Sequence, residues 1–373
     1  MKRNIFFIIL TILLTNFSAY AQNRKADRNS EKRSQPKNII LLIGDGMGLS
    51  QMYAAYTVTR DNLHMTRCPN IALVKTFSDS DYITDSAAAG TAIATGHKTT
   101  NGFIGMLPDK TRVPSILKYA EDFGLATGLV STSAITHATP ASFISCVENR
   151  NMTEEIARQF LYTDIEVFIG GGYDNFSKRA DGLNLIDSLM ARKYNVARTI
   201  PEMMAVNGGK MAALLYPNHA PKFSEGRGDM LSLSTAKAID LLSTDENGFF
   251  LMVEGSQIDW GGHDNDLGYV INETIDFDKA CSVALEFAER NKETLVIITA
   301  DHETGGLSLP VEELVSGSPV GKFTTGDHSA IPVPLYAKGP GSDQFFGLID
   351  NTDIFKTMYH LFGFDVLEKG LKR

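Results

Sequence analysis

Short apolar runs that stop abruptly at polar or glycine-rich residues recur along the chain. Continuous apolar runs of this kind are typical of strands buried on both faces of a parallel sheet. Amphipathic segments lie between several of them and predict helices. We expect strands at Asn38–Ile43, Leu125–Val130, Phe168–Ile169, Phe249–Val253, Thr294–Thr299 and Val333–Ala337. We expect helices at Val113–Phe123, Ser234–Leu242 and Ile275–Arg290.

The alternation of strands and helices predicts an α/β fold, in which a large and mostly parallel central sheet is sandwiched by helices. No internal repeat, low-complexity tract or clear domain boundary interrupts the pattern, so residues 38–373 are expected to form a single domain. Ligands of parallel sheets collect at the carboxyl ends of the strands. The polar residues that follow the apolar runs are therefore the first candidates for a functional site.

The N-terminal residues have the pattern of a cleaved secretory signal. Two basic residues precede the apolar run Ile5–Leu14, and the A-x-A triplet Ala19–Ala21 follows it. The apolar run is only about half as long as a membrane-spanning helix, although a short anchor is the alternative. We expect cleavage of residues 1–21, a polar lead-in over residues 22–37, and an exported protein, periplasmic or secreted, that has no membrane attachment after cleavage.

Composition excludes several classes of protein. The chain has 373 residues and a net charge of −9, and an acidic protein is a poor candidate for specific binding of nucleic acid. Cys68, Cys146 and Cys281 are too few for a disulfide scaffold or a four-cysteine zinc site. In an oxidising compartment they could form one pair at most, and the sequence leaves the pairing open.

Carboxylate and imidazole residues follow several of the predicted strands. These residue types are the usual ligands of Zn²⁺, and carboxylates with hydroxyls suit Mg²⁺. Each alone has an ordinary explanation: a single Asp after a strand is often a helix cap, and glycines between Asp259 and His263 favour a surface pair. The number of such clusters in one domain favours a metal centre. The candidates are Asp45, Glu254, Asp259, His263, Asp301, His302 and His328.

Ser86 is the candidate nucleophile. It precedes the small-residue run Ala87–Ala89, which favours a helix, so Ser86 is expected at a helix N-terminus, where free backbone N–H groups attract phosphate. The alternative is that Asp85 or Ser86 only caps that helix. The G-x-S-x-G elbow of a serine hydrolase is absent from the sequence, so activation by a metal is one recognised possibility.

Together these motifs resemble the alkaline phosphatase family, in the order that the family has them. The matching segments are Ile43–Gly48, Asp85–Thr91, Glu254–Asp259 with His263, and Ala300–Gly306. The resemblance extends from about residue 37 to the C-terminus and implies a large, mostly parallel sheet between helices. It also implies broad hydrolysis of small phosphate monoesters to an alcohol and inorganic phosphate, through a phosphoserine intermediate, with two zinc ions and one magnesium ion.

The resemblance implies a role for each matching residue. Ser86 corresponds to the nucleophile. The implied ligands are Asp45, Asp301 and His302 for the zinc beside the serine, Asp259, His263 and His328 for the other zinc, and Glu254 and Thr139 for magnesium, to which Asp45 would bridge.

Three further positions lie near this implied site. Arg150 has the spacing of the family's phosphate-binding arginine, although an exposed helix residue is the alternative. His137 falls where the family has Asp or His, and is expected to act on the magnesium through a water molecule. Trp260 occupies a position where relatives often carry Lys or His, and would add an aromatic face to the substrate site.

One departure concerns assembly. Only 25 residues, 303–327, separate His302 from His328, where many relatives insert a much longer subdomain that contributes to the dimer. A short insert is therefore expected here, and the sequence leaves both a monomer and a homodimer open.

Three other functions fit the sequence less well. A phosphodiesterase of the same superfamily would more often carry Thr as the nucleophile and lack the Glu254–Thr139 magnesium pair. A non-catalytic protein that binds metal or phosphate would usually have lost at least one of the matching residues. A sulfatase is disfavoured because the residues after Ser86 do not match its C/S-x-P-x-R motif.

Overall fold

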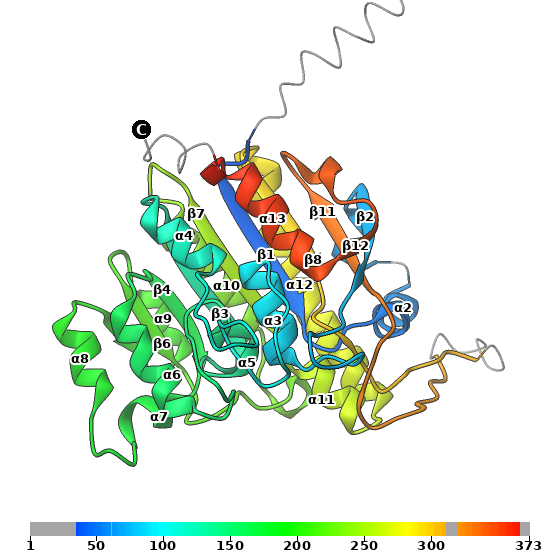
Figure 1. Ribbon diagram of the computed structural model, residues 1–373, viewed down its shortest axis with the longest axis horizontal. Coiled ribbons are helices and arrows are strands. Elements are labelled where there is room, and N and C mark those ends of the chain that lie inside the picture. The colour runs from blue at the N-terminus through cyan, green and yellow to red at the C-terminus, as the bar shows by residue number, and fades with distance from the viewer. Residues whose placement is uncertain (1–34, 61, 311–318, 366–373) are drawn as a thin grey trace, which may run out of the picture. The chain divides into compact units, whose positions relative to one another are not determined.

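A ten-stranded sheet forms the centre of the fold, in the order β12-β2-β11-β8-β1-β7-β3-β4-β6-β5 (Figure 1). The computed structural model describes residues 35–60, 62–310 and 319–365. The expected signal 1–21 and most of the expected lead-in 22–37 therefore lie outside the described residues. The residues from Pro36 onward cluster as one unit.

The sheet strands are β1 (Asn38–Gly44), β2 (Asn70–Lys75), β3 (Ala126–Ala134), β4 (Val167–Gly171), β5 (Asn195–Ala197), β6 (Met211–Leu214), β7 (Phe249–Gly255), β8 (Thr294–Thr299), β11 (Val333–Lys338) and β12 (Gly347–Asp350). A separate two-stranded sheet contains β9 (Glu303–Thr304) and β10 (His328–Ser329).

The α-helices are α2 (Leu49–Val58), α3 (Ser86–Thr95), α4 (Ile116–Asp122), α5 (Ala138–Ala141), α6 (Thr153–Gln159), α7 (Tyr173–Ser177), α8 (Leu185–Ala191), α9 (Ile200–Ala205), α10 (Met230–Leu242), α11 (Gln257–His263), α12 (Leu267–Asn291) and α13 (Asn351–Leu361). Short 3₁₀ helices lie at His64–Arg67, Phe160–Tyr162, Phe223–Glu225 and Ser342–Gln344.

The predicted fold class is confirmed, because every strand pairing in the large sheet is parallel except those of β11. The position of β11 corrects one expectation. It runs antiparallel to both β8 and β2, so the polar turn after it lies at the edge of the sheet away from the carboxyl ends of the other strands. An apolar run indicates a buried strand but does not encode its direction.

Four strands of the large sheet, β2, β5, β6 and β12, were not predicted, and neither were the two short strands β9 and β10. The strand β2 contains the short apolar run Ile71–Val74, but it lies near one edge of the sheet and alternates buried and exposed residues. The strands β5 and β6 lie at the other edge and are short. Conversely, β3 continues beyond the predicted end through Ser131–Ala134, whose small polar residues are fully buried.

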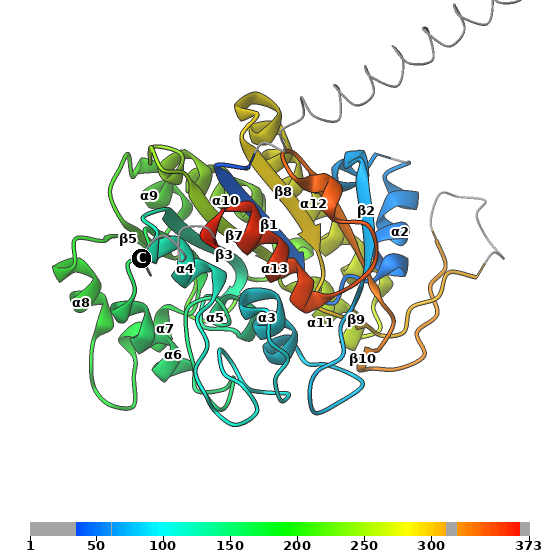
Figure 2. The same ribbon diagram turned by 45° about the horizontal axis from the view of Figure 1, so that its top comes forward.

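Helices cover both faces of the sheet. The helices α3, α4, α5 and α13 lie on one face, and α10 and α12 lie on the other (Figures 1 and 2). The long helix α12 also contacts α2 and α11, so it connects the sheet with the segments that follow β1 and β7. None of the described helices is both long enough and apolar enough to cross a membrane.

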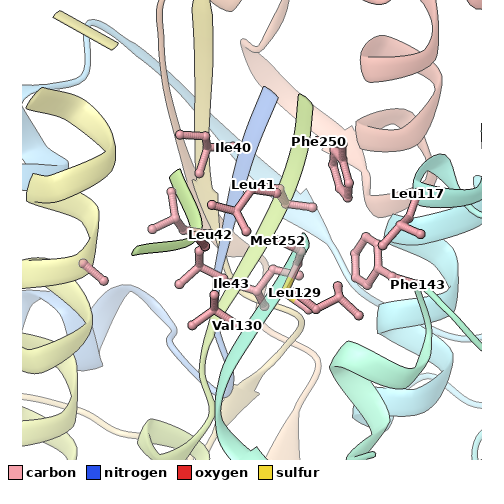
Figure 3. Close-up of a cluster of buried hydrophobic side chains, with 14 of the residues drawn as sticks. Ile40, Leu41, Leu42, Ile43, Leu117, Leu129, Val130, Phe143, Phe250 and Met252 are labelled. Atoms are coloured by element: carbon pink, nitrogen blue, oxygen red, sulfur yellow. The ribbon is translucent and has the colours of Figure 1, made fainter. Parts of the chain in front are cut away.

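The core lies between the central strands and these helices, as Figure 3 shows for part of it. Residues Ile40–Ile43 of β1 are fully buried, and side chains alternate between the two faces of a strand, so β1 contributes to both layers. On the α4–α5 side, the rings of Phe143 and Phe250 stack with centroids 5.9 Å apart. Leu117 of α4 packs in the same cluster.

The cysteines are unpaired in the structure. Cys68 and Cys281 are buried, and Cys146 is partly buried.

Candidate active site

Three neighbouring strands deliver acidic residues to one edge of the sheet. The register pairs Ile43 of β1 with Glu254 of β7 on one side and with Thr299 of β8 on the other. Asp45 directly follows β1, and Asp301 follows β8 by two residues. All three carboxylates are fully buried. The parallel arrangement therefore brings together residues that are more than 200 positions apart in the chain.

Ser86 is the first residue of α3 and is also buried. The helix cap is Asp85, whose carboxylate accepts a hydrogen bond from the Ala88 N–H at 2.9 Å. Because Asp85 makes the cap, the Ser86 hydroxyl is left to face the acidic cluster. Its Oγ lies 3.2 Å from Nε2 of His302. Small residues let α3 pack closely here: a Cβ on Gly90 would lie 2.8 Å from Ser142 Oγ.

His302 lies at the centre of the cluster. Its Nε2 is 3.2 Å from Asp301 Oδ2 and 3.6 Å from Asp45 Oδ1. These three residues offer donor atoms that all lie within 4.8 Å of one another. The His302 ring also stacks on His328, with centroids 3.6 Å apart, and His302, His328 and Asp259 form a second such group.

Asp259 and His263 both belong to α11, with His263 Nε2 3.3 Å from Asp259 Oδ1. The two glycines of this helix are needed because neighbouring segments pack closely against them. A Cβ on Gly261 would lie 2.8 Å from the Val270 backbone nitrogen, and a Cβ on Gly262 would lie 2.8 Å from Thr304 Cβ. Reading Asp259 and His263 as a surface pair is therefore wrong for Asp259, which is buried.

The small β9–β10 sheet brings His328 to the same place. His328 pairs with Thr304 in an antiparallel register, and its Nε2 lies 3.5 Å from Asp259 Oδ1. The Thr304 hydroxyl donates to the same Asp259 oxygen at 2.5 Å. The short insert predicted between His302 and His328 thus supplies the pairing that positions His328 and the hydroxyl that holds Asp259.

A third group of donors consists of Asp45, Glu254 and His137. Glu254 accepts hydrogen bonds at Oε2 from the hydroxyls of Ser131 and Ser256, at 2.5 and 2.7 Å. Its Oε1 is buried without a hydrogen bond.

Thr139 of α5 lies beside this third group. Its hydroxyl is buried without a hydrogen-bond partner, and it is one of the groups that partly offset the rise in the pKa of Glu254 that burial causes.

Burial and mutual repulsion dominate the electrostatics of the three strand-end carboxyls. Burial raises the pKa of Asp45 well above its ordinary value, and the charges of Asp301, Asp259 and Glu254 raise it further. Burial, followed by the charge of Asp259, raises the pKa of Asp301 to about 7. Burial also raises the pKa of Glu254. Like charges this close favour protonation unless a cation neutralises them.

The imidazoles divide into two kinds. Burial lowers the pKa of His302 well below its ordinary value and that of His137 to about 3, so both rings are neutral at neutral pH. The hydrogen bond to Asp259 raises the pKa of His263 to about 9. Burial would raise the pKa of Asp259, but its bonds to His263 and His328 hold it well below the ordinary value.

The chemistry of this donor set fits divalent cations. Both oxygens of Asp45, one oxygen each of Asp301 and Glu254, the Thr139 hydroxyl and Nδ1 of His137 are buried without a hydrogen-bond partner. Buried polar atoms in folded proteins normally have a partner. Within the described residues, no Lys or Arg forms an ion pair with Asp45, Glu254 or Asp301. Oxygen and neutral imidazole donors converging in this way suit Zn²⁺ and Mg²⁺.

Arg150 borders the cluster from the side of α3. It lies in a turn rather than on an exposed helix face, and its side chain is 24% exposed. One guanidinium nitrogen donates to Asp85 at 3.0 Å, and another lies 3.5 Å from His137 Nε2. The guanidinium is therefore held between His137 and Asp85, the residue that directly precedes Ser86.

Trp260 of α11 faces two imidazole rings. Its indole centroid lies 6.2 Å from that of His137 and 4.8 Å from that of His219, both at nearly right angles. His219 was not among the predicted site residues, because it stands in a polar turn after β6 without a recognisable motif. The supporting hydroxyls of Ser131 and Ser256 were not among them either, since their only signal was their position after a predicted strand.

Comparison with known proteins agrees with this geometry. The family model described as alkaline phosphatase matches residues 36–320. Alkaline phosphatase 3 of Bacillus subtilis is 33% identical, and the match covers 93% of each chain. Alkaline phosphatase of Escherichia coli is 32% identical over 89% of this chain and 87% of its own.

A solved structure is also similar. The alkaline phosphatase of the Antarctic bacterium TAB5 is 41% identical and superposes with a TM-score of 0.85 over 88% of this chain and 99% of that chain. A variant of the TAB5 enzyme was solved with magnesium bound.

The protein is a phosphoric monoester hydrolase, as indicated by its sheet, by the buried serine among clustered donors and by these relatives. More narrowly, the chain belongs to the alkaline phosphatase family. The family resemblance of the sequence motifs is thereby confirmed.

Proposed function

We propose that the protein hydrolyses phosphate monoesters through a phosphoserine intermediate on Ser86, with two zinc ions and one magnesium ion bound beside it. The observation that carries the proposal is the position of the Ser86 hydroxyl, 3.2 Å from His302 Nε2. His302 is one of the donors proposed for the zinc beside Ser86, and it also lies in the donor group of Asp259 and His328. In this proposal the His302 imidazole holds a metal ion, so it is not free to act as a general base toward Ser86, and the hydroxyl needs another source of activation.

The proposal assigns a set of donors to each cation, and Asp45 is shared by two of the sets. Asp45, Asp301 and His302 would hold the zinc beside Ser86, and Asp259, His263 and His328 would hold the other. Asp45, Glu254 and Thr139 would hold magnesium, with His137 close by. Bound divalent cations would supply the positive charge that lowers the pKa of a hydroxyl and stabilises charge on phosphoryl oxygens.

The chain's own residues then direct the reaction. The Ser86 oxygen forms a bond to phosphorus while the bond from phosphorus to the leaving oxygen breaks, which releases the alcohol. Water then cleaves the new phosphoester and releases inorganic phosphate, which restores Ser86. Arg150 can donate two parallel hydrogen bonds to phosphoryl oxygens, and α3 presents the positive end of its dipole to the same group.

Substrate range follows from what the site contacts. In this proposal the phosphoryl group lies among Arg150 and the donor groups. These residues bind the phosphoryl group and do not recognise the alcohol part of the substrate. We therefore propose broad activity on small phosphate monoesters, with Trp260 as a contact at the edge of the site.

The test is the Ser86→Ala variant, measured with p-nitrophenyl phosphate and with bis-p-nitrophenyl phosphate, with and without a chelator. The proposal expects loss of turnover and of trapped phosphoenzyme, while the purified variant keeps the metal content of the parent. It also expects the parent to prefer the monoester and to lose activity on chelation. Normal turnover by Ser86→Ala, or preference for the diester, would overturn it.

A further inference from the structure

Three aromatic rings form a closed cluster at one side of the candidate active site. The ring centroids of His137, His219 and Trp260 lie 4.8–6.2 Å apart, and each pair meets edge to face at 84–87°. Such perpendicular pairs lie within the favourable range for aromatic contacts. His137 precedes α5 and Trp260 lies on α11, so the cluster joins two segments that carry candidate ligands.

Of the two imidazoles in the cluster, His219 is the one that belongs to none of the donor groups. It stands in the turn after β6, and its Nδ1 accepts a hydrogen bond from the Ala134 N–H at 3.0 Å. That bond anchors the imidazole to the end of β3 and leaves the proton of the neutral ring on Nε2. The ring is therefore held in one orientation, with its contact to Trp260 the shortest in the cluster.

The cluster also reaches the phosphate side of the site. Nε2 of His137 lies 3.5 Å from a guanidinium nitrogen of Arg150, whose other terminal nitrogen is bound by Asp85. A shift of the Trp260 indole would remove one of the contacts that hold the His137 ring. That ring is one of only two side chains that hold Arg150 by these contacts among the described residues.

We propose that His219 is a positioning residue: it holds the Trp260 indole against His137 and thereby fixes the Arg150 guanidinium for binding of the phosphoryl group. The proposal rests on the proposed function, in which Arg150 contacts phosphate. His219 itself touches neither substrate nor metal. The effect of losing it should therefore fall on phosphate affinity and KM rather than on kcat.

Trp260 gives a direct readout, because it is the single tryptophan of the chain. In the holoenzyme, His219→Ala should shift the tryptophan emission to longer wavelength and increase its quenching by acrylamide. The KM for p-nitrophenyl phosphate and the inhibition constant of inorganic phosphate should rise about 2- to 10-fold, the equivalent of one lost aromatic pair. The exposed His97 offers a matched control, and His97→Ala should change none of these values.

Two further variants separate the ring from its anchor. His219→Phe keeps an aromatic ring but loses the acceptor, whereas His219→Asn keeps an acceptor for the Ala134 N–H but loses the ring. The proposal expects His219→Phe to have an emission wavelength and a KM close to those of the parent. It expects His219→Asn to resemble His219→Ala in both. Rescue by Asn alone, or a parental KM in all three variants, would overturn it.

These results are distinguishable from a failure of the proposed function. If Arg150→Ala left inhibition by phosphate unchanged, the role of Arg150 in phosphate binding would fail, whatever the tryptophan emission showed. If Arg150→Ala weakened inhibition but the His219 variants did not, only the positioning role of His219 would fail.

Discussion

The Arg150 guanidinium donates to the Asp85 carboxylate at 3.0 Å, and the same carboxylate caps the helix that begins at Ser86. One side chain therefore sets both the start of α3 and the position of the arginine. This arrangement places a cation, a helix N-terminus and a hydroxyl on the same side of the acidic cluster. It accounts for an aspartate directly before the candidate nucleophile, beyond its ordinary function as a cap.

Removing the guanidinium should weaken phosphate binding. In Arg150→Ala, we expect the inhibition constant of inorganic phosphate to rise. The rise should correspond to a loss of about 1–3 kcal/mol of binding free energy, the value of hydrogen bonds to charged groups. Arg150→Lys keeps the charge without the two-pronged geometry, so it should recover only part of the loss. Inhibition assays on the three proteins measure this, and unchanged inhibition in Arg150→Ala would remove the arginine from the phosphate site.

The hydroxyl of Thr304 should support metal binding through Asp259. Thr304→Val removes the hydrogen bond to Asp259 Oδ1 while it keeps the side-chain shape. Loss of such a supporting bond typically weakens metal affinity by about 10- to 100-fold. Competition with a chelator, followed by metal analysis, measures the change. Thr324→Val serves as the control, because Thr324 donates only to the Gly306 carbonyl, and an equal loss there would contradict the assignment.

The backbone at Gly46 should tolerate no side chain. Gly46 has φ +75°, and a Cβ would lie 2.6 Å from the Cα of Asp259. Gly182 has φ +74° but open space around it, so Gly182→Ala should cost only the left-handed backbone strain of about 1–2 kcal/mol. Gly46→Ala should lose more stability and, unlike the control, lose activity and metal content. Thermal unfolding and metal analysis compare the two, and equal behaviour would refute the close approach.

Stability should depend on the ionisation of Glu121. Burial raises the pKa of Glu121 to about 7, so the folded state favours the protonated carboxyl and loses stability as pH rises from about 4.5 through 7. Glu121→Gln does not titrate there. The free energy of unfolding of Glu121→Gln should equal that of the parent near pH 5. Near pH 9 it should be about 1–3 kcal/mol higher than that of the parent.

Denaturant unfolding at the two pH values measures this difference. Glu246 is exposed, so Glu246→Gln should show no pH-dependent gain. A constant difference between Glu121→Gln and the parent across the pH range would show that the carboxyl does not ionise as described.

Much of the site could be predicted because its residues follow strands. The buried runs of β1, β7 and β8 are read directly from hydrophobicity, and the acidic residues stand at or just after their ends. Parallel strands bring their carboxyl ends to one edge of the sheet, so the proximity of these acidic residues could be predicted from the sequence. The Asp259–His263 helix could not be predicted in this way, because its glycines are explained only by the segments that pack against them.

Hydrophobic periodicity and short motifs can be recognised without the fold, and they were enough to predict the α/β class, the family and the candidate donors. The direction of β11, the sharing of His302 between two donor groups, and the contacts of His219 with Trp260 and Ala134 became visible in the folded molecule alone. These depend on which distant segments lie side by side, and no local pattern in the chain encodes that proximity.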